Sequence, residues 1–183
     1  VWARSEKRVP LSRQAREALG LASDEELTPN DVVSAILRAP VDLLWNGGIG
    51  TFVKASFETN ADVGDRPNDA VRVDGRDVRA RVVGEGGNLG FTQRGRIEYA
   101  QAGGRLNIDA IDNSGGVDIS DHEVNLKILL GIAVDEGSIT RDERDELLRA
   151  VEGEVAEFVL YDNYLQAQIV SQEVAASAER LEA

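Results

Sequence analysis

Cysteine and methionine are absent from this chain of 183 residues, and histidine occurs once, at position 122. Without cysteine the chain has no disulfide, no thiolate metal site and no cysteine nucleophile. A single histidine also excludes a multi-histidine metal site within the chain. This composition is typical of proteins from a reducing compartment, so we expect a cytoplasmic protein with no metal site.

Long apolar runs are also absent, since no stretch approaches the roughly 20 apolar residues of a membrane helix. Positive charge is scarce, because 20 Lys and Arg against 33 Asp and Glu leave a formal net charge of -13. Such a balance argues against a surface that binds nucleic-acid phosphates. Apolar residues make up 42% and charged residues 29% of the chain, as in a soluble globular domain with or without an appendage. We therefore expect neither a membrane nor a nucleic acid as a partner.

The first residues are Val-Trp-Ala-Arg, and no methionine follows anywhere. A complete protein normally starts with methionine, or with a small residue once methionine is removed. The sequence therefore predicts an internal segment of a longer protein, with a processed or engineered terminus as the alternative.

Helix boundaries are well marked in the first forty residues. Ser12 is a predicted N-cap and Gly20 a predicted left-handed terminator of one short helix. A second helix is predicted to begin at Thr28, with Pro29 at its first position, and to stop before Pro40.

Two apolar runs that break on glycine predict buried parallel strands, "VDLLWNGG" at 41–48 and "ARVVGEGG" at 80–87. Between them, Asp74 and Gly75 predict a turn joining two short strands. A helix is expected from Thr92 to about residue 102, and "LNIDAIDNSGGVD" then predicts a strand that opens into a second glycine loop. The fold class predicted is α/β, a partial Rossmann-like parallel sheet with flanking helices, followed by an α-helical C-terminal segment.

Two capping boxes predict helices in the last third of the chain. One pairs Ser120 with Glu123, and the other pairs Thr140 with Glu143. The second starts a long amphipathic region, read as one long helix or as two with a break at "YDNY", residues 161–164. Apolar residues at helical spacing predict that these helices pack on their own domain or on a neighbour.

The stretch "VVGEGGNLGFTQRGRIEYA", residues 82–100, raises the question of a nucleotide site. Its glycines read G-x-G-x-x-x-G between a predicted strand and a predicted helix, a loose relative of the dinucleotide fingerprint. Asp109 and Asp112 follow at about the distance of the acidic residue that binds a ribose in that motif.

Glu85 argues against a phosphate loop, because its carboxylate would stand where phosphate charges should sit. The glycine spacing is also one residue too long. From the residues alone, three interpretations of this loop stay open: a phosphate cradle, another ligand-lining role, and a purely structural turn.

The second glycine loop, "DNSGGVDISDHE", places Asn113 and Ser120 before a predicted helix N-terminus. Free N–H groups and the helix dipole favour a carboxylate or phosphate there. Ser120 would either contact such a group or only cap its helix, and His122 is expected to be a surface residue.

Both loops together resemble the glutamate dehydrogenase superfamily, and most closely the very long bacterial NAD-specific glutamate dehydrogenases. The family carries E-G-A-N-x-P-T and, after a helix and a strand, N-A-G-G-V with a serine and a glutamate just beyond. The matching residues here come in the same order: Glu85, Gly86, Gly87, Asn88 and Thr92, then Asn113, Ser114, Gly115, Gly116, Val117, Ser120 and Glu123. The resemblance covers most of the chain, from about residue 11 to 168.

This resemblance implies a segment from the later half of a Rossmann-like NAD-binding domain, residues 1–130, followed by a helical C-terminal segment, residues 131–183. It implies NAD as the cofactor, with the nicotinamide-ribose side of the cleft lined by residues from the glycine loops: Asn46, Gly47, Gly48, Gly86, Gly87, Asn88 and Asn113. Ser120 would contact the distal carboxylate of the substrate.

The reaction implied is oxidative deamination of L-glutamate to 2-oxoglutarate and ammonia with reduction of NAD, in a parent protein that is a homo-oligomer. The family's catalytic lysine and aspartate, and its pyrophosphate loop, match nothing here and are expected earlier in the parent chain. We therefore expect the isolated segment to be inactive and to bind NAD weakly or not at all.

Two other functions remain open at this stage. One is a stand-alone α/β nucleotide-binding protein that uses "GEGGNLG" as its own phosphate site. The other is a non-catalytic interaction module whose working surface is the acidic helical tail.

Overall fold

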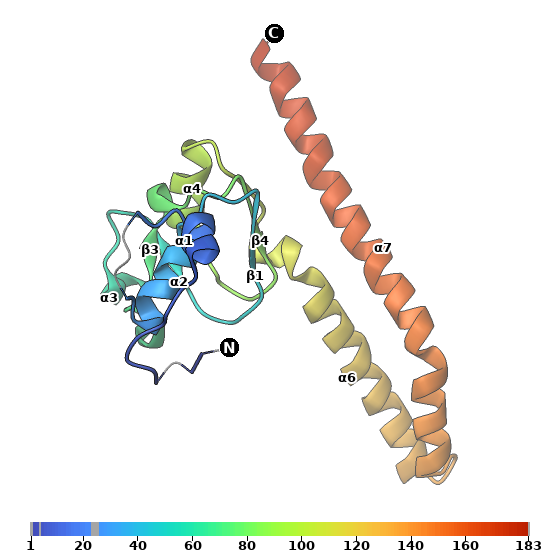
Figure 1. The fold of residues 1–183 in the computed structure, drawn as a ribbon. Helices are drawn as coiled ribbons and strands as arrows, with labels where there is room; N and C mark the ends of the chain where they lie inside the picture. Colours follow the sequence, from blue (N-terminus) through green and yellow to red (C-terminus); the bar gives the residue numbers. More distant parts are fainter. Residues whose placement is uncertain (1, 4, 23–25, 183) are drawn as a thin grey trace. The chain divides into compact units, whose positions relative to one another are not determined.

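The computed structural model describes residues 2–3, 5–22 and 26–182, and the chain forms two compact units, residues 1–112 and 113–183. Unit 1 is mixed α/β and unit 2 is a pair of helices (Figure 1). A parallel α/β layer followed by a helical C-terminal segment confirms the predicted fold class. Among the described residues, no helix is both long enough and apolar enough to span a bilayer.

Unit 1 contains two small parallel sheets. The first is formed by β1 (Leu43–Asn46), β4 (Val82–Glu85) and β5 (Arg105–Leu106), in the order β1-β4-β5. The second pairs β2 (Val53–Lys54) with β3 (Val73–Asp74). Because the strands of each sheet are parallel, their carboxyl ends lie on the same edge.

Three helices of unit 1 begin and end close to the predicted residues, and two four-residue helices were not predicted. Their bounds are α1 Arg13–Leu19, α2 Pro29–Leu37, α3 Asn60–Val63, α4 Gln93–Gln101 and α5 Asp109–Asp112. Ser12 accepts a hydrogen bond from the N–H of Ala15, and Gly20 ends α1 in the left-handed conformation. Thr28 and Asp31 form the predicted capping box of α2, and Thr92 caps α4.

A buried cluster joins both sheets to α4. Its members are Val53, Val73, Val78, Ala80, Val83, Phe91 and Tyr99. The rings of Phe91 and Tyr99 lie 6.0 Å apart, and the Tyr99 hydroxyl donates to the carbonyl of Ala80 at 2.7 Å. Burial raises the pKa of the Tyr99 hydroxyl, against a backbone hydrogen bond from Arg105. This core supports β4 and the glycine loop that follows it.

Of the two short strands predicted on either side of Asp74 and Gly75, the structure contains the first and not the second. The chain enters β3 and then turns through 3-10 helix η2 (Gly75–Asp77), preceded in the sequence by η1 (Arg66–Asn68). β3 pairs in parallel with β2, so the turn does not form a hairpin. Val78 and Ala80 enter the core instead of a second paired strand.

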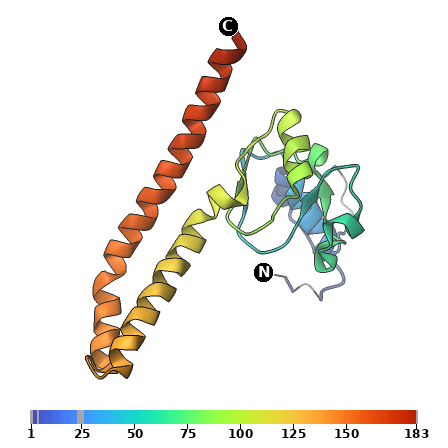
Figure 2. The same cartoon turned by 180° about the vertical axis from the view of Figure 1, so that it is seen from behind.

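Unit 2 consists of α6 (Ser114–Asp135) and α7 (Arg141–Glu182), which run antiparallel and side by side next to their connecting turn (Figures 1 and 2). Thr140 and Glu143 form the predicted capping box. α7 is one unbroken helix, so a break at residues 161–164 does not occur.

The predicted second glycine loop is also wrong. β5 is only two residues long, α5 follows it, and α6 already begins at Ser114, with Asn113 as its N-cap residue. Ser120 therefore lies inside α6 and is not an N-cap. Packing of the first turn of α6 against α7 overrides the low helix propensity of Gly115 and Gly116.

Candidate functional site

Two loops rich in glycine and asparagine leave neighbouring strands at the same edge of the sheet. β1 and β4 are in parallel register, with Trp45 beside Gly84 and Asn46 beside Glu85. The loop after β1 holds Gly47 and Gly48, and the loop after β4 runs from residue 86 to 90. The structure thus brings together six of the predicted site residues: Asn46, Gly47, Gly48, Gly86, Gly87 and Asn88.

The two loops approach so closely that Gly87 has no room for a side chain. A Cβ at this position would lie 2.3 Å from the carbonyl oxygen of Gly48. Farther along the loop, a Cβ at Gly90 would lie 2.0 Å from the amide nitrogen of Asn46. Gly87 therefore has to be glycine, and there the two loops form one backbone surface. The atom near Gly90 belongs to the side chain of Asn46, which can move.

Trp45 covers the strand that leads to this surface. A Cβ at Gly84 would lie 2.6 Å, and one at Gly86 2.3 Å, from atoms of the indole ring. Trp45 nevertheless stays 60% exposed. Glycines at 84 and 86 thus let a large aromatic ring lie flat over β4.

The carboxylate of Glu85 lies inside the protein and not on the surface of the loop. The charge of Glu85 is therefore no argument against a phosphate at this loop. Its side chain is fully buried and accepts two hydrogen bonds from Arg96, Nε to Oε1 at 2.6 Å and Nη2 to Oε2 at 2.9 Å. Oε2 also accepts the N–H of Phe91 at 3.1 Å. A bidentate guanidinium with a third donor satisfies a buried carboxylate.

Arg96 links this carboxylate to a second one. Its Nη2 donates to Asp109 Oδ1 at 2.9 Å, and its Nη1 donates to Gln93 at 3.2 Å. Burial alone would lower the pKa of Arg96, but the hydrogen bond and charge of Glu85, joined by Asp109, outweigh burial and raise that pKa. The guanidinium is therefore a permanent charge at the centre of the network.

Asp109 and Asp112 hold the glycine loop rather than offering a carboxylate to a ribose. Asp109 Oδ2 accepts the N–H of Leu89 at 2.8 Å, and Asp112 Oδ2 accepts the N–H of Glu85 at 2.9 Å. The ribose role weighed for these two residues is thus replaced by a loop-holding role.

A phosphate cradle needs unoccupied backbone N–H groups. Two donors of this loop and its exit, from Leu89 and Phe91, are already bound to carboxylates. Of the three interpretations of residues 82–100, these contacts argue against the phosphate cradle.

Asn113 and Ser120 belong to unit 2. Asn113 is half-buried directly before α6 and makes no side-chain capping hydrogen bond, while Ser120 is exposed on the helix. Ser114 is buried, and its hydroxyl contacts the side chain of Asn163 on α7. A helix-terminus site for an anion at Ser120 is therefore wrong, because the helix begins six residues earlier.

Two residues of the site, Trp45 and Arg96, were not predicted. Arg96 is 11 residues from Glu85 and 13 from Asp109. The three residues lie on different elements, so no periodicity within one helix or strand links them. The one available signal was Glu85 itself, since a carboxylate at the end of a buried strand needs a cationic partner.

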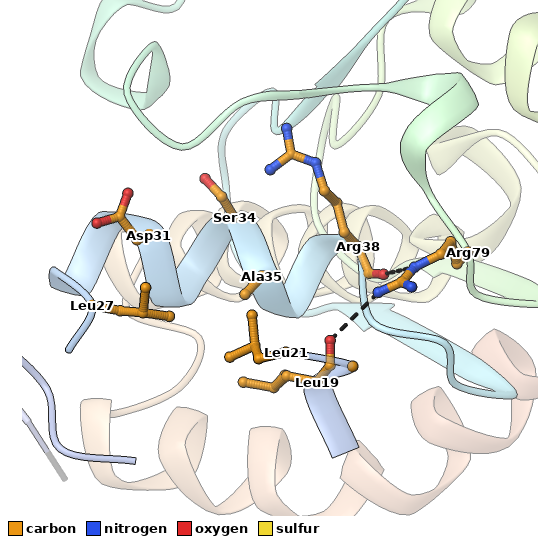
Figure 3. A pocket seen from close by; sticks show the side chains of 9 residues that line it. Leu19, Leu21, Leu27, Asp31, Ser34, Ala35, Arg38 and Arg79 are labelled. Atoms are coloured by element: carbon orange, nitrogen blue, oxygen red, sulfur yellow. Dashed lines mark hydrogen bonds between the residues drawn. The ribbon is translucent and has the colours of Figure 1, made fainter. Parts of the chain in front are cut away.

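A separate pocket lies between the end of α1 and α2 (Figure 3). Its polar groups are all engaged locally. Asp31 caps α2, the Ser34 hydroxyl donates to Val71, and Arg79 donates to the carbonyls of Arg38 at 2.6 Å and Leu19 at 3.4 Å. Arg79 thus neutralises the carbonyl ends of two helices, and the pocket is structural.

Comparison with known proteins agrees with the family resemblance found in the sequence. The model of the family described as bacterial NAD-glutamate dehydrogenase, catalytic domain, matches residues 1–173. A protein of Mycobacterium tuberculosis named NAD-specific glutamate dehydrogenase is 52% identical over 186 residues, covering 99% of this chain and 12% of that protein.

Two further relatives carry the same name. The protein of Halomonas elongata is 53% identical over 168 residues, covering 92% of this chain and 10% of its own length. The protein of Pseudomonas aeruginosa is 50% identical over 181 residues, covering 99% of this chain and 11% of its own length. The chain spans about a tenth of the length of these curated relatives. On this evidence, the chain belongs to the family of bacterial NAD-specific glutamate dehydrogenases.

Proposed function

We propose that this chain is part of the NAD-binding region of a glutamate dehydrogenase that oxidises L-glutamate with NAD and water to 2-oxoglutarate, ammonia and NADH. Unit 1 supplies the later half of a Rossmann-like domain, for which the sequence predicts an extent to residue 130, and residues 131–183 continue as a helical segment. The observation that carries the proposal is the single backbone surface where Gly87 meets Gly48. Such an edge, at the carboxyl ends of parallel strands, is where ligands bind in α/β folds.

The cofactor role falls to the two loops. Gly48, where a Cβ would meet no atom within 4 Å, lets a flat ring and its ribose approach the backbone closely beside Gly47. Gly86 and Gly87 instead pack against Trp45 and Gly48, and in this way they shape the second loop that lines the ring. Asn46 and Asn88 then supply amide groups that donate and accept hydrogen bonds at the ends of this surface. The phosphates of NAD are held elsewhere in the parent protein, because the loop commits N–H groups to its own carboxylates.

The substrate role of Ser120 rests on the family motif and on the exposure of its hydroxyl. In this proposal the hydroxyl donates to the distal carboxylate of glutamate, and Asn113 contributes a polar contact on the cofactor side. The catalytic lysine and aspartate lie outside this chain, which is therefore inactive alone, and the parent is a cytoplasmic homo-oligomer.

The test uses the full-length dehydrogenase and follows glutamate-dependent formation of NADH. Replacing Asn88 with alanine is expected to raise the KM for NAD about tenfold through loss of a hydrogen bond in a partly desolvated site. Asn30→Ala, at an exposed asparagine on α2 of the same unit, is the matched control and should leave KM unchanged. A full-length protein without glutamate-dependent NADH formation would refute the proposal.

The isolated chain separates this proposal from its rivals. A stand-alone nucleotide-binding protein predicts NAD binding by the isolated chain in calorimetry, and we expect little or none. An acidic interaction module predicts that deleting residues 140–183 abolishes capture of a partner protein and leaves NAD binding by the parent unaltered. The near-complete match to dehydrogenases supports neither rival.

A further inference from the structure

The loop that carries Asn88 is shaped by an unusual residue. Leu89, directly after Asn88, has φ 55°, a left-handed conformation that side chains other than glycine and asparagine rarely adopt. Leu89 is 61% exposed, so packing of its side chain does not hold it there. Something else must maintain this backbone conformation.

The backbone N–H of Leu89 is held by Asp109, at 2.8 Å. Asp109 comes from α5, 20 residues along the chain, and its side chain is only 18% exposed. Its second oxygen pairs with Arg96, which is itself locked to the buried Glu85. Asp109 is therefore held rigidly by one oxygen and holds Leu89 with the other.

The rest of the loop is anchored independently. The carbonyl of Gly90 accepts hydrogen bonds from the N–H groups of Phe52 and Val53 at 2.8 and 3.1 Å. Phe91 N–H is bound by Glu85. Among these anchors, the one next to Asn88 is the contact of Asp109 with Leu89, so Asp109 controls the position of Asn88 more directly than the others.

We infer that Asp109 is a positioning residue for NAD: through the N–H of Leu89 it fixes the left-handed backbone that presents Asn88 to the cofactor. The inference rests on the proposed function. Asp109 itself touches neither NAD nor glutamate. Its removal should therefore weaken NAD binding while leaving the affinity for glutamate in place.

The test compares three variants of the full-length dehydrogenase by calorimetry with NAD and by steady-state kinetics. Asp109→Ala is expected to raise the Kd and KM for NAD about tenfold, the effect of losing one charge-assisted hydrogen bond. The KM for glutamate should change less than twofold. Asp109→Asn retains one acceptor oxygen and should recover about half of the loss on a logarithmic scale.

Asp62→Ala is the control, because Asp62 lies in the other four-residue helix of unit 1, α3, and accepts the N–H of Thr59 at 2.8 Å. It should leave both KM values unchanged. An unchanged Kd for NAD in Asp109→Ala, or an equal rise in both KM values, would overturn the inference. If the alanine variant does not fold, an unchanged Kd in Asp109→Asn overturns it too. A wild-type protein without glutamate-dependent NADH formation would instead refute the proposed function.

Discussion

The two units of this chain are stabilised in different ways. Unit 1 buries charged side chains and satisfies them: the side chains of Arg72 and Glu85 are fully buried, and Arg96 is nearly so. Unit 2 leaves large apolar side chains half exposed on α6, such as Val124 at 50% and Ile128 at 58%. Where its side chains are described, unit 2 buries only Ser114 and Val159.

This difference shows which part of the chain specifies its own geometry. A network of buried charges has few alternative arrangements, because each unpaired member costs several kcal/mol, on the order of 3 to 5. The stability of two helices that pack along one face, such as α6 and α7, depends mainly on their caps and on local helix propensity. Buried charges thus fix the loops of unit 1, whereas unit 2 owes its helices mainly to local signals, apart from the first turn of α6, which packs on α7.

The largest loss of stability is expected when the central cation of the buried network in unit 1 is removed. Arg96→Ala leaves Glu85 buried without its charge partner and should lower the free energy of unfolding by about 3 to 5 kcal/mol. Urea unfolding followed by tryptophan fluorescence reports on this unit alone, because both tryptophans, Trp2 and Trp45, lie in it.

Arg94→Ala is the control on the same helix, since this exposed guanidinium lies 5.8 Å from the ring centre of Phe57 and should cost less than about 1 kcal/mol. Equal losses in the two variants would mean that the buried network does not dominate the stability of unit 1.

A second test concerns the contact between the loops. Gly87→Ala must push Gly48 away and should cost about 1 to 3 kcal/mol, measured by the same urea titration. Gly48→Ala probes the opposite partner, and there a Cβ would have no neighbour within 4 Å. We expect that variant to unfold like the wild type, and similar losses in both would contradict the close approach.

Acid unfolding gives a smaller effect with a defined direction. Partial burial would raise the pKa of Glu98, but hydrogen bonds from the Ser56 hydroxyl and from the N–H groups of Arg76 and Ser56 outweigh it and lower that pKa below 4.5. A carboxyl with a lowered folded pKa stabilises fully above its unfolded pKa, and this stabilisation disappears as pH falls through the folded pKa.

Glu98→Gln should therefore cost about 1 to 2 kcal/mol at neutral pH. The difference from wild type should vanish as pH falls below 4.5 toward the lowered pKa. Urea titrations at several pH values measure it, and a difference that stays constant with pH would show that the charge of Glu98 is not involved.

The smallest effects belong to unit 2 and test where its helices begin. Thr140→Ala removes a true capping box and should cost about 1 kcal/mol of helix stability. Ser120→Ala lies inside α6 and should be neutral or stabilising by up to about 0.5 kcal/mol. Thermal unfolding followed by circular dichroism at the helix band compares them, and a loss at Ser120 equal to that at Thr140 would indicate a cap at residue 120.

Predictions from the sequence succeeded where a feature depends on residues close together in the chain. Capping by Ser12, Thr28, Thr92 and Thr140 was readable because each hydrogen bond spans three residues. The two glycine loops were readable because an apolar run that breaks on glycine marks the end of a parallel strand. The family resemblance followed from two motifs in their order and spacing, at residues 85–92 and 113–123.

Predictions failed where distant residues decide. The sequence predicts a loop at Gly115 and Gly116. In the structure a Cβ at Gly115 would lie 3.1 Å from the side-chain amide nitrogen of Asn163, 48 residues away. Close packing of α6 on α7 uses the small residue and keeps it helical. Likewise, Glu85 was predicted to repel a phosphate, because the sequence does not show that Arg96 neutralises its charge.

The amino-acid sequence alone thus established four helix caps, the ends of β1 and β4, the acidic and cysteine-free character of the chain and its family, since all of these follow from local or compositional information. The tertiary structure decided which way Glu85 faces, what holds Leu89 in its left-handed conformation and where α6 begins. These depend on contacts between residues 11 to 49 positions apart. Such contacts form only when burial makes an unpaired charge or a poorly packed helix costly.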